Sequence, residues 1–289
     1  MRRLTAGLAT LLMLFACALA GAKAGAEAGA EAGAEAPPPA QDGKIRLLWL
    51  GQSAFRITTP GGKVIVIDPW LTKSTRAPAR YKELSALGRI DLLLVTHAHA
   101  DHLGDAPALA RLHGIPLWGP SGMNQALATL GVLPAHLLPR FDKGGTINPL
   151  PGIKVTATHA EHSSALVWHN PTLDRDETHY GGEPTGLIIE LENGFRIWHM
   201  GDTGIFGDMK WIAEYYKPDL VLMPIGGNFT MDPVDAAWAT REMIKPRFVI
   251  PMHYGANPQG KGTPKQYLDA LGESRVKVFE MQPGETLEF

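Results

Sequence analysis

The feature that most constrains the fold of this chain is the place where residues 92–95, an apolar Leu-Leu-Leu-Val segment, run directly into metal-binding side chains. The segment predicts a short strand that is buried on both faces. His97 and His99 follow it, and side chains two residues apart on extended backbone lie on the same side, so both can bind one ion. Asp101 and His102 come next, as the chain turns, and can reach a second position beside the first. Because neutral imidazole suits zinc and its first-row neighbours, the stretch predicts a metal site rather than a polar surface loop.

Three later predicted strands also end at metal-binding side chains. After the first of them, His159 and His162 compete to be the third imidazole at the first ion. After the second, Asp202 is our candidate for a carboxylate that bridges two ions, and Gly201 before it lets the backbone come close to a bulky centre. After the third comes His253. The sequence therefore predicts that ligands from distant strand ends meet at one place.

Three other polar residues near element ends have roles that the sequence alone leaves open. Asp68 ends a β-branched strand and is either a turn residue before Pro69 or a carboxylate that orients a metal-bound histidine. His199 can also orient a ligand, although a histidine that faces its own sheet is the simpler interpretation. Asp105 is expected to cap a helix.

The composition bounds the class of protein. The chain has 289 residues, 45% of them hydrophobic, which is enough for one sizeable core or two small ones. The formal net charge is -2 and no basic stretch stands out, so we expect a small-molecule substrate and no nucleic-acid partner. The single cysteine, Cys17, has no partner for an internal disulfide.

The first 42 residues are expected to lie outside the folded domain. A basic start, an apolar core over residues 8–19 and two small-x-small sites predict a signal peptide at residues 1–24, and hence export to the periplasm or the medium. An Ala-Gly-Glu repeat and three prolines predict a solvated linker at residues 25–42. The alternatives are a membrane anchor or a lipoprotein, and membrane contact is expected only if Cys17 is lipidated. The folded domain is expected at residues 43–289.

Strands alternate with helices along this domain, which predicts an α/β protein with layered sheets. Residues 165–183 are expected to form a polar, irregular stretch that can line a pocket mouth through Trp168, His169, His179 and Tyr180, although an ordinary surface loop explains each residue equally well. The expected strands are 44–50, 55–58, 63–67, 92–95, 117–118, 153–158, 185–190, 195–200, 219–223, 247–250 and 275–279, and the expected helices are 105–113, 121–130, 208–216, 232–244 and 264–271.

Four separated motifs in this order resemble the metallo-β-lactamase superfamily. They are His97-Ala98-His99-Ala100-Asp101-His102, His162-Ser163-Ser164, Gly201-Asp202-Thr203 and Pro251-Met252-His253. The resemblance covers about residues 44–289 and implies a four-layer αβ/βα sandwich. Within the superfamily the chain is most similar to the UPF0173 metal-dependent hydrolases, related to the ascorbate-lactone hydrolases. Gly201-Asp202-Thr203 before Asp208 and the run from Ile225 to Met231 carry that closer likeness, whereas Gln52 stands where relatives often have His.

The resemblance also implies a ligand set. His97, His99 and His162 would hold the first ion, Asp101, His102 and His253 the second, and Asp202 would bridge both. It favours His162 over His159, because the family places its histidine directly before a Ser-Ser pair. We expect two zinc ions, with Mn²⁺, Fe²⁺ and Ni²⁺ as alternatives that the same ligands accept.

The expected activity is that of an exported hydrolase, in which a hydroxide bridging two divalent ions attacks a lactone, an ester or a phosphodiester. Asp101 is the candidate for passing the proton. The alternatives are an enzyme like the N-acyl phospholipid phosphodiesterases and a non-catalytic exported metal-binding protein. His99 argues against the di-iron redox branch, which has Glu at this position, and the lack of a cysteine outside the leader argues against true β-lactamase activity.

Overall fold

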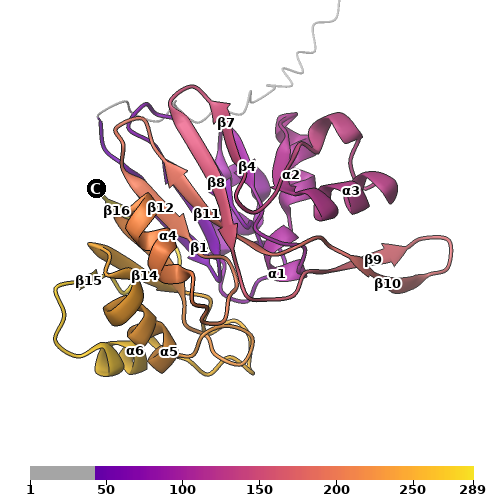
Figure 1. The fold of residues 1–289 in the computed structure, drawn as a ribbon. Coiled ribbons are helices and arrows are strands. Elements are labelled where there is room, and N and C mark those ends of the chain that lie inside the picture. Colours follow the sequence, from indigo (N-terminus) through magenta and orange to yellow (C-terminus); the bar gives the residue numbers. More distant parts are fainter. Residues whose placement is uncertain (1–42) are drawn as a thin grey trace, which may run out of the picture. The chain divides into compact units, whose positions relative to one another are not determined.

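The structure is a computed structural model that describes residues 43–289. The predictions of a signal peptide, of a linker and of lipidation at Cys17 concern residues 1–42 and lie outside the described residues. Within residues 43–289, two seven-stranded sheets pack face to face, and helices cover the outer face of each (Figure 1). No helix in this part of the chain is both long and apolar enough to span a membrane.

The first sheet has the strand order β16-β1-β2-β3-β4-β5-β6. β1 and β2 pair antiparallel, as the sequence predicts, while β3, β4 and β5 run parallel, so that their carboxyl ends meet at one edge. Its strands are β1 (Arg46–Gly51), β2 (Ala54–Thr58), β3 (Val64–Ile67), β4 (Leu92–Leu94), β5 (Leu117–Pro120), β6 (Arg140–Phe141) and β16 (Thr286–Glu288).

The second sheet has the strand order β15-β14-β13-β12-β11-β8-β7. β12, β13 and β14 are parallel, and β8 runs in the same direction as β12 because each pairs antiparallel with β11 between them. The carboxyl ends of β8, β12 and β14 therefore also share an edge. The strands are β7 (Thr146–Leu150), β8 (Ile153–His159), β11 (Thr185–Glu190), β12 (Arg196–His199), β13 (Leu220–Pro224), β14 (Phe248–Met252) and β15 (Lys277–Val278).

Helices form the two outer layers, and a short one lies at the strand ends. α2 and α3 pack on the first sheet, α4, α5 and α6 pack on the second, and α1 follows directly after β4. The helices are α1 (Ala100–Leu103), α2 (Ala106–His113), α3 (Ser121–Thr129), α4 (Met209–Tyr216), α5 (Pro233–Trp238) and α6 (Pro264–Leu271), with the 3₁₀ helices η1 (Ala79–Lys82), η2 (Leu84–Leu87) and η3 (Ala135–Leu137) and the π-helix η4 (Ala239–Ile244).

The alternation of side chains along β1 shows why these strands are apolar at every position. Leu47 and Trp49 point into the core between the two sheets, whereas Leu48 and Leu50 point into the core beneath the helices. Because each central strand is covered on both faces, a strand such as β3, with the sequence Val-Ile-Val-Ile, is fully buried. The four-layer αβ/βα sandwich predicted from the sequence is thereby confirmed.

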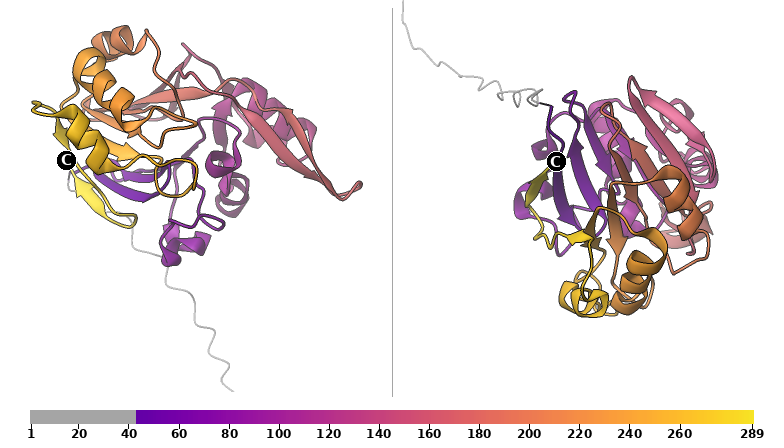
Figure 2. Two further views of the ribbon diagram at one scale, coloured as in Figure 1. Left: turned by 90° about the horizontal axis from the view of Figure 1, so that it is seen from below. Right: turned by 60° about the vertical axis from the view of Figure 1, so that its left-hand side comes forward.

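Residues 165–183 differ from the prediction. They form an antiparallel hairpin of β9 (Ala165–Asn170) and β10 (Arg175–Tyr180), which projects beyond the two main sheets (Figure 2). Burial alternates along both strands: Leu166 is buried and Trp168 half-buried on one face, whereas Val167 and Tyr180 on the other face are 56% and 66% exposed. Polar residues such as His179 occupy part of the more buried face, so the sequence carries little of the apolar–polar alternation that marks a strand.

Other differences are smaller. β6, β7 and β16 were not predicted, and the strand expected at residues 275–279 is reduced to the two residues of β15. Asp105 occupies the N-cap position of α2, but its side chain does not cap the helix. Its carboxylate instead accepts hydrogen bonds from the backbone of Leu71 and Thr72 and from the Thr72 hydroxyl. Asp105 therefore anchors the loop after β3, a long-range role that local sequence does not reveal.

The helix that begins after Asp232 provides a test of the local structure. The Asp232 carboxylate accepts hydrogen bonds from the backbone N–H groups of Val234 and Asp235, at 2.8 and 2.9 Å. We expect Asp232→Ala to lower the free energy of unfolding by about 1 kcal/mol, because two backbone donors lose their partner. Urea denaturation measures the change. Asp235→Ala removes an acid from the same turn without removing the cap, and an equal loss in both variants would contradict this assignment.

Candidate metal centre

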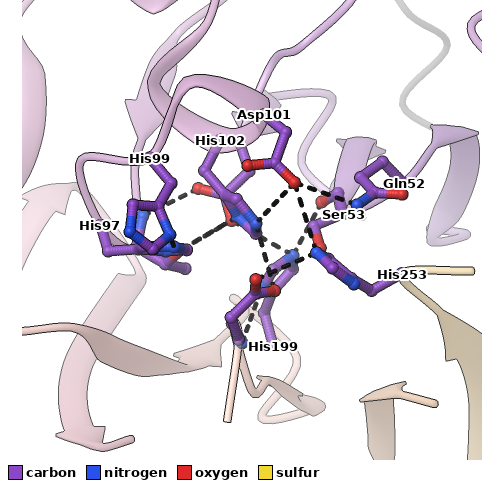
Figure 3. Close-up of polar contacts among 12 residues, drawn as sticks. Gln52, Ser53, His97, His99, Asp101, His102, His199 and His253 are labelled. Atoms are coloured by element: carbon purple, nitrogen blue, oxygen red, sulfur yellow. Dashed lines mark hydrogen bonds and ion pairs between the residues drawn. The ribbon is translucent and has the colours of Figure 1, made fainter. Parts of the chain in front are cut away.

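Five chain segments bring metal-binding side chains to the common edge of the two sheets. His97 and His99 follow β4, Asp101 and His102 lie on α1, and the three remaining side chains follow β8, β12 and β14. The last of these, His253, has a φ of 57°, a left-handed backbone conformation that non-glycine residues rarely adopt. Figure 3 shows His97, His99, Asp101, His102 and His253 turned toward one another.

The seven predicted ligands form two groups in the structure. The first contains His97, His99 and His162, and the second contains Asp101, His102, Asp202 and His253, with the ligand atoms of each group within 4.8 Å of one another. In the first group, His99 Nδ1 lies 3.0 Å from His97 Nε2 and 3.2 Å from His162 Nε2. These three ring nitrogens surround one point, as the ligands of a single ion would.

Asp202 connects the two groups. Its Oδ1 lies 3.1 Å from His102 Nε2, and its Oδ2 lies 3.0 Å from His253 Nε2. Oδ2 also lies 3.6 Å from His162 Nε2, which belongs to the first group. The carboxylate thus stands between the two candidate positions, where a bridging ligand would have to lie.

The competition between His159 and His162 is resolved by position. His159 is directed away from the cluster: its Nε2 lies 3.3 Å from the Glu161 carboxylate, and its ring packs edge-on against Phe206. His162 lies within the first group, in agreement with the preference stated above.

Burial keeps the imidazoles of the first group neutral. Desolvation lowers the pKa of His97 well below its usual value, and the nearby His102 lowers it further. Desolvation is also the main cause that lowers the pKa of His99 and of His162. Neutral imidazole is the form that binds a metal, so this group is prepared for a cation at neutral pH.

The second group has the opposite electrostatics. Burial by itself would lower the pKa of His253, but the carboxylates of Asp202 and Asp101 beside the ring raise it to about 9. The carboxylates of Asp202 and Asp68 likewise overcome burial and raise the pKa of His102 well above its usual value. Burial would raise the pKa of Asp202, yet His102 and His253 hold it well below the usual range. The protons on the His102 and His253 rings thus balance the negative charge of the carboxylates around them, and a divalent cation could replace both protons.

Several buried atoms of the second group fit a cation. His102 Nε2, His253 Nε2 and Asp202 Oδ1 are buried and lie close to one another, but none has a hydrogen bond of ordinary geometry in the described structure. Leaving such atoms without a hydrogen bond costs free energy. Imidazole nitrogens and carboxylate oxygens around one point are also the donors that zinc and its first-row neighbours take. The residues present therefore fit the metal that the sequence predicts.

Asp68 lies where a carboxylate can orient a histidine of the centre, which is the second of the two roles that the sequence left open. It is fully buried, and its Oδ2 lies 2.7 Å from His102 Nδ1. Its other contacts are hydrogen bonds accepted from the backbone N–H and the hydroxyl of Thr96. The carboxylate therefore fixes the ring of His102 so that Nε2 faces Asp202, which is how a carboxylate orients a metal-binding histidine.

His199 lies beneath the cluster without joining either group. Its Nε2 donates a hydrogen bond to the backbone oxygen of Ser53 at 2.9 Å, and it lies 4.0 Å from Asp68 Oδ2. The simpler interpretation was that His199 only faces its own sheet. The ring instead joins β12 to the turn after β1, which belongs to the other sheet (Figure 3).

Gly201 makes a close approach, but to protein rather than to a metal. Its φ is 63°, and a Cβ there would lie 2.6 Å from the backbone oxygen of Thr185 and 3.2 Å from Thr96 Cβ. The missing side chain lets the two sheets meet at this edge. The backbone and hydroxyl of Thr185 both donate hydrogen bonds to Thr96 O, which holds them together.

Gln52 is a contributor that sequence reasoning left without a role. Its side-chain Nε2 donates a hydrogen bond to Asp101 Oδ2 at 3.0 Å, and its backbone oxygen accepts one from the N–H of His253 at 3.1 Å. Figure 3 shows its amide turned toward Asp101. Gln52 thus holds one candidate ligand that follows the first sheet, Asp101, and one that follows the second, His253. The only local sign is the turn Gly51-Gln52-Ser53, which does not reveal what the turn contacts.

The centre is open to solvent on one side. The Asp101 side chain is 31% exposed, whereas the Asp202 side chain is 3% exposed. A cavity of about 470 Å³ adjoins His162 and is also lined by Ser163, His179 and Tyr180. Two of the four residues suggested for a pocket mouth therefore line this cavity. Trp168 lines a different cavity, and His169 contacts Asp174 and Asp176.

The raised pKa of His253 predicts how metal affinity changes with pH. Below about pH 9 a cation must displace the proton on this ring, so affinity in the second group should increase up to that pH. An ordinary histidine, with a pKa of about 6.5, is almost fully neutral above about pH 7.5. Zn²⁺ titrations of chelator-treated protein should therefore show one site that continues to tighten between these two pH values. Affinities that are constant over this interval would contradict the pairing of His253 with Asp202.

The contact between Asp68 and His102 leads to a second prediction. Asp68→Asn should weaken metal binding by about 10- to 100-fold, because the amide no longer holds the ring as a carboxylate does. Competition with a metal-binding dye measures this. Asp105→Asn alters a carboxylate that holds the same loop but contacts no histidine of the centre, and it should bind metal like the wild type.

Comparisons with known proteins agree with this geometry. Residues 63–254 match the family model described as the β-lactamase superfamily domain. A UPF0173 metal-dependent hydrolase of Polaromonas sp. is 65% identical over 86% of this chain and 90% of its own length. Another, of Polynucleobacter asymbioticus, is 60% identical over 88% of this chain and 89% of its own length.

Among solved structures, a metallo hydrolase from the hyperthermophilic archaeon Ignicoccus hospitalis is 32% identical. It aligns with a TM-score of 0.72 over 85% of this chain and 98% of its own. The fold, the clustered histidines and acids and these relatives lead to one conclusion: the chain belongs to the β-lactamase superfamily and, within it, to the UPF0173 metal-dependent hydrolases.

Proposed function

We propose that this metal-dependent hydrolase binds two divalent cations, expected to be Zn²⁺, and cleaves a lactone, an ester or a phosphodiester. The observation that carries the proposal is the position of Asp202 between two groups of candidate ligands. His97, His99 and His162 would hold one ion, Asp101, His102 and His253 the other, and Asp202 would contact both. Mn²⁺, Fe²⁺ and Ni²⁺ suit the same donors.

The charge of such a centre suits the proposed reaction. All the imidazoles would be neutral, so two divalent cations would face only the carboxylates of Asp101 and Asp202. The net positive charge would stabilise an anionic transition state, such as the one formed from an ester, a lactone or a phosphodiester. When bound, the ions would polarise the scissile bond and lower the pKa of water from about 15.7 to about 7.

Access to the centre supports catalysis over a purely structural metal site. Structural zinc sites are closed by four protein ligands, whereas catalytic sites keep one position open. Here Asp101 is partly exposed, and the cavity beside His162 gives a small molecule room to approach. A non-catalytic metal-binding protein would need neither feature.

Asp101 suits the role of ligand better than that of proton carrier. Burial would raise its pKa, but the neighbouring imidazoles of His102 and His253 lower it below its usual value. A carboxylate with a lowered pKa is ionised at neutral pH and is a weak base. Proton transfer by Asp101 would therefore be slow unless the substrate complex alters this environment.

We further propose that the enzyme is exported, on the basis of the basic start, the apolar core and the small-x-small sites in residues 1–24. Amino-terminal sequencing of the protein recovered from the periplasmic or extracellular fraction tests this. A mature chain that begins within a few residues of position 25 is the expected result, and an intact Met1 in the cytoplasmic fraction would contradict it.

The ligand assignment is tested by removing one residue from each part of the centre. His97→Ala and Asp202→Ala should each abolish hydrolysis of a panel of lactones, esters and phosphodiesters and also reduce the bound metal, measured by elemental analysis. His159→Ala is the matched control, because this histidine lies next to the centre but outside both groups, and it should retain both properties. Turnover by a metal-free variant would refute the scheme.

A further inference from the structure

The loop after β3 carries two cationic side chains, Lys73, which is exposed, and Arg76, which is half-buried. Ser74 is fully buried, and its hydroxyl accepts hydrogen bonds from the backbone N–H groups of Arg76 and Ala77, both at 3.2 Å. Upstream, the Asp105 carboxylate holds the backbone of Leu71 and Thr72. The backbone that carries Arg76 is therefore tied down at both of these points before any ligand arrives.

Arg76 packs against two segments that belong to the centre. Its backbone lies against Gly51, where a Cβ would come within 3.2 Å of it. Its guanidinium lies against Gly255, where a Cβ would be 3.6 Å from Nε and 3.7 Å from Cζ. Gly51 directly precedes Gln52, and Gly255 comes two residues after His253. Arg76 thus lies against chain neighbours of Gln52 and His253, the two residues that contact the exposed ligand Asp101.

The guanidinium lacks the partner that a half-buried arginine normally has. Arg76 Nε is buried and has no hydrogen-bond partner among the described residues. No carboxylate of residues 43–289 forms an ion pair with Arg76, although Glu280 and Glu285 act electrostatically on the neighbouring Tyr254. An unpaired buried donor is costly, and a guanidinium is most readily satisfied by a planar or tetrahedral oxyanion.

We propose that Arg76 binds an oxyanion carried by the substrate, a carboxylate or a phosphate, while the scissile bond lies at the metal centre. The inference rests on the proposed hydrolase function and narrows its substrate class to anionic molecules. A fork of N–H donors on a preorganised loop binds such groups with defined geometry, which positions the rest of the molecule. Lysine at this position would keep the charge but lose the fork.

A series of three matched nitrophenyl esters tests the proposal on the metal-loaded enzyme. Their acyl chains end in a methyl, a carboxylate or a phosphate group, so the series also separates the two oxyanions. We expect Arg76→Met to raise KM by about 10- to 100-fold for whichever charged ester the wild type prefers and to leave the neutral ester unchanged. Arg76→Lys should recover part of the loss.

Arg80→Met is the matched control, because Arg80 is an exposed cation of the same segment that lies over the ring of Tyr81. It should behave like the wild type on all three esters. Circular dichroism and thermal unfolding establish that each variant is folded. Equal effects of Arg76→Met on charged and neutral esters would overturn the proposal while leaving the hydrolase function intact.

A binding measurement does not depend on turnover. Inorganic phosphate and succinate are titrated into metal-loaded wild type, Arg76→Met and Arg80→Met, and Kd is obtained from the rise in Tm. Anion binding to the metal itself is common to all three proteins and does not distinguish them. The proposal is supported if Arg76→Met alone weakens the Kd for at least one of the two anions by about tenfold or more. Equal Kd values in all three proteins for both anions would overturn it. Failure of every protein to cleave any ester would count against the proposed function alone.

Discussion

The buried carboxylate of Asp202 is the interaction on which the rest of the centre depends. It contacts His102 from the first sheet and His253 from the second, and it approaches His162 as well. A carboxylate that is 3% exposed must be compensated by cations or protons. In the absence of a metal, protons on His102 and His253 perform this role, and a divalent cation can replace them. The same pairing that stabilises the folded chain thus reserves a place for the metal.

The two sheets meet at this edge through a small number of backbone contacts. Thr96 O accepts two hydrogen bonds from Thr185, and Gln52 O accepts one from the N–H of His253. Gly201 allows the approach because a Cβ there would lie only 3.2 Å from Cβ of Thr96, which follows β4 of the first sheet. The candidate ligands therefore come from two sheets that are joined by hydrogen bonds beside the centre itself. Such support is what a metal site needs if its ligands are to remain in place.

The surroundings of the more exposed ligands differ in chemistry. A cavity lined by His179 and Tyr180 from the projecting hairpin adjoins His162. Gln52 donates a hydrogen bond to Asp101, and Arg76 lies against Gly51, the residue before Gln52. A substrate with a hydrolysable bond near one end and an oxyanion at the other would match this arrangement. The exposed part of the site is thus chemically asymmetric, while its buried part is uniformly built from histidine and aspartate.

The sequence by itself predicted layered sheets and a metal site after residues 92–95, and its resemblance to the metallo-β-lactamase superfamily implied the four layers and the full set of candidate ligands. Apolar runs at strand spacing mark strands buried on both faces, and a cluster such as His97, His99, Asp101 and His102 is rare without a metal. Only the tertiary structure revealed the contacts of Asp68, His199 and Gln52, and it showed a hairpin where a loop was expected at residues 165–183. The physical reason is range. A strand or a ligand motif is encoded within a few neighbouring residues, whereas the partner of a buried polar group depends on which distant segment packs against it.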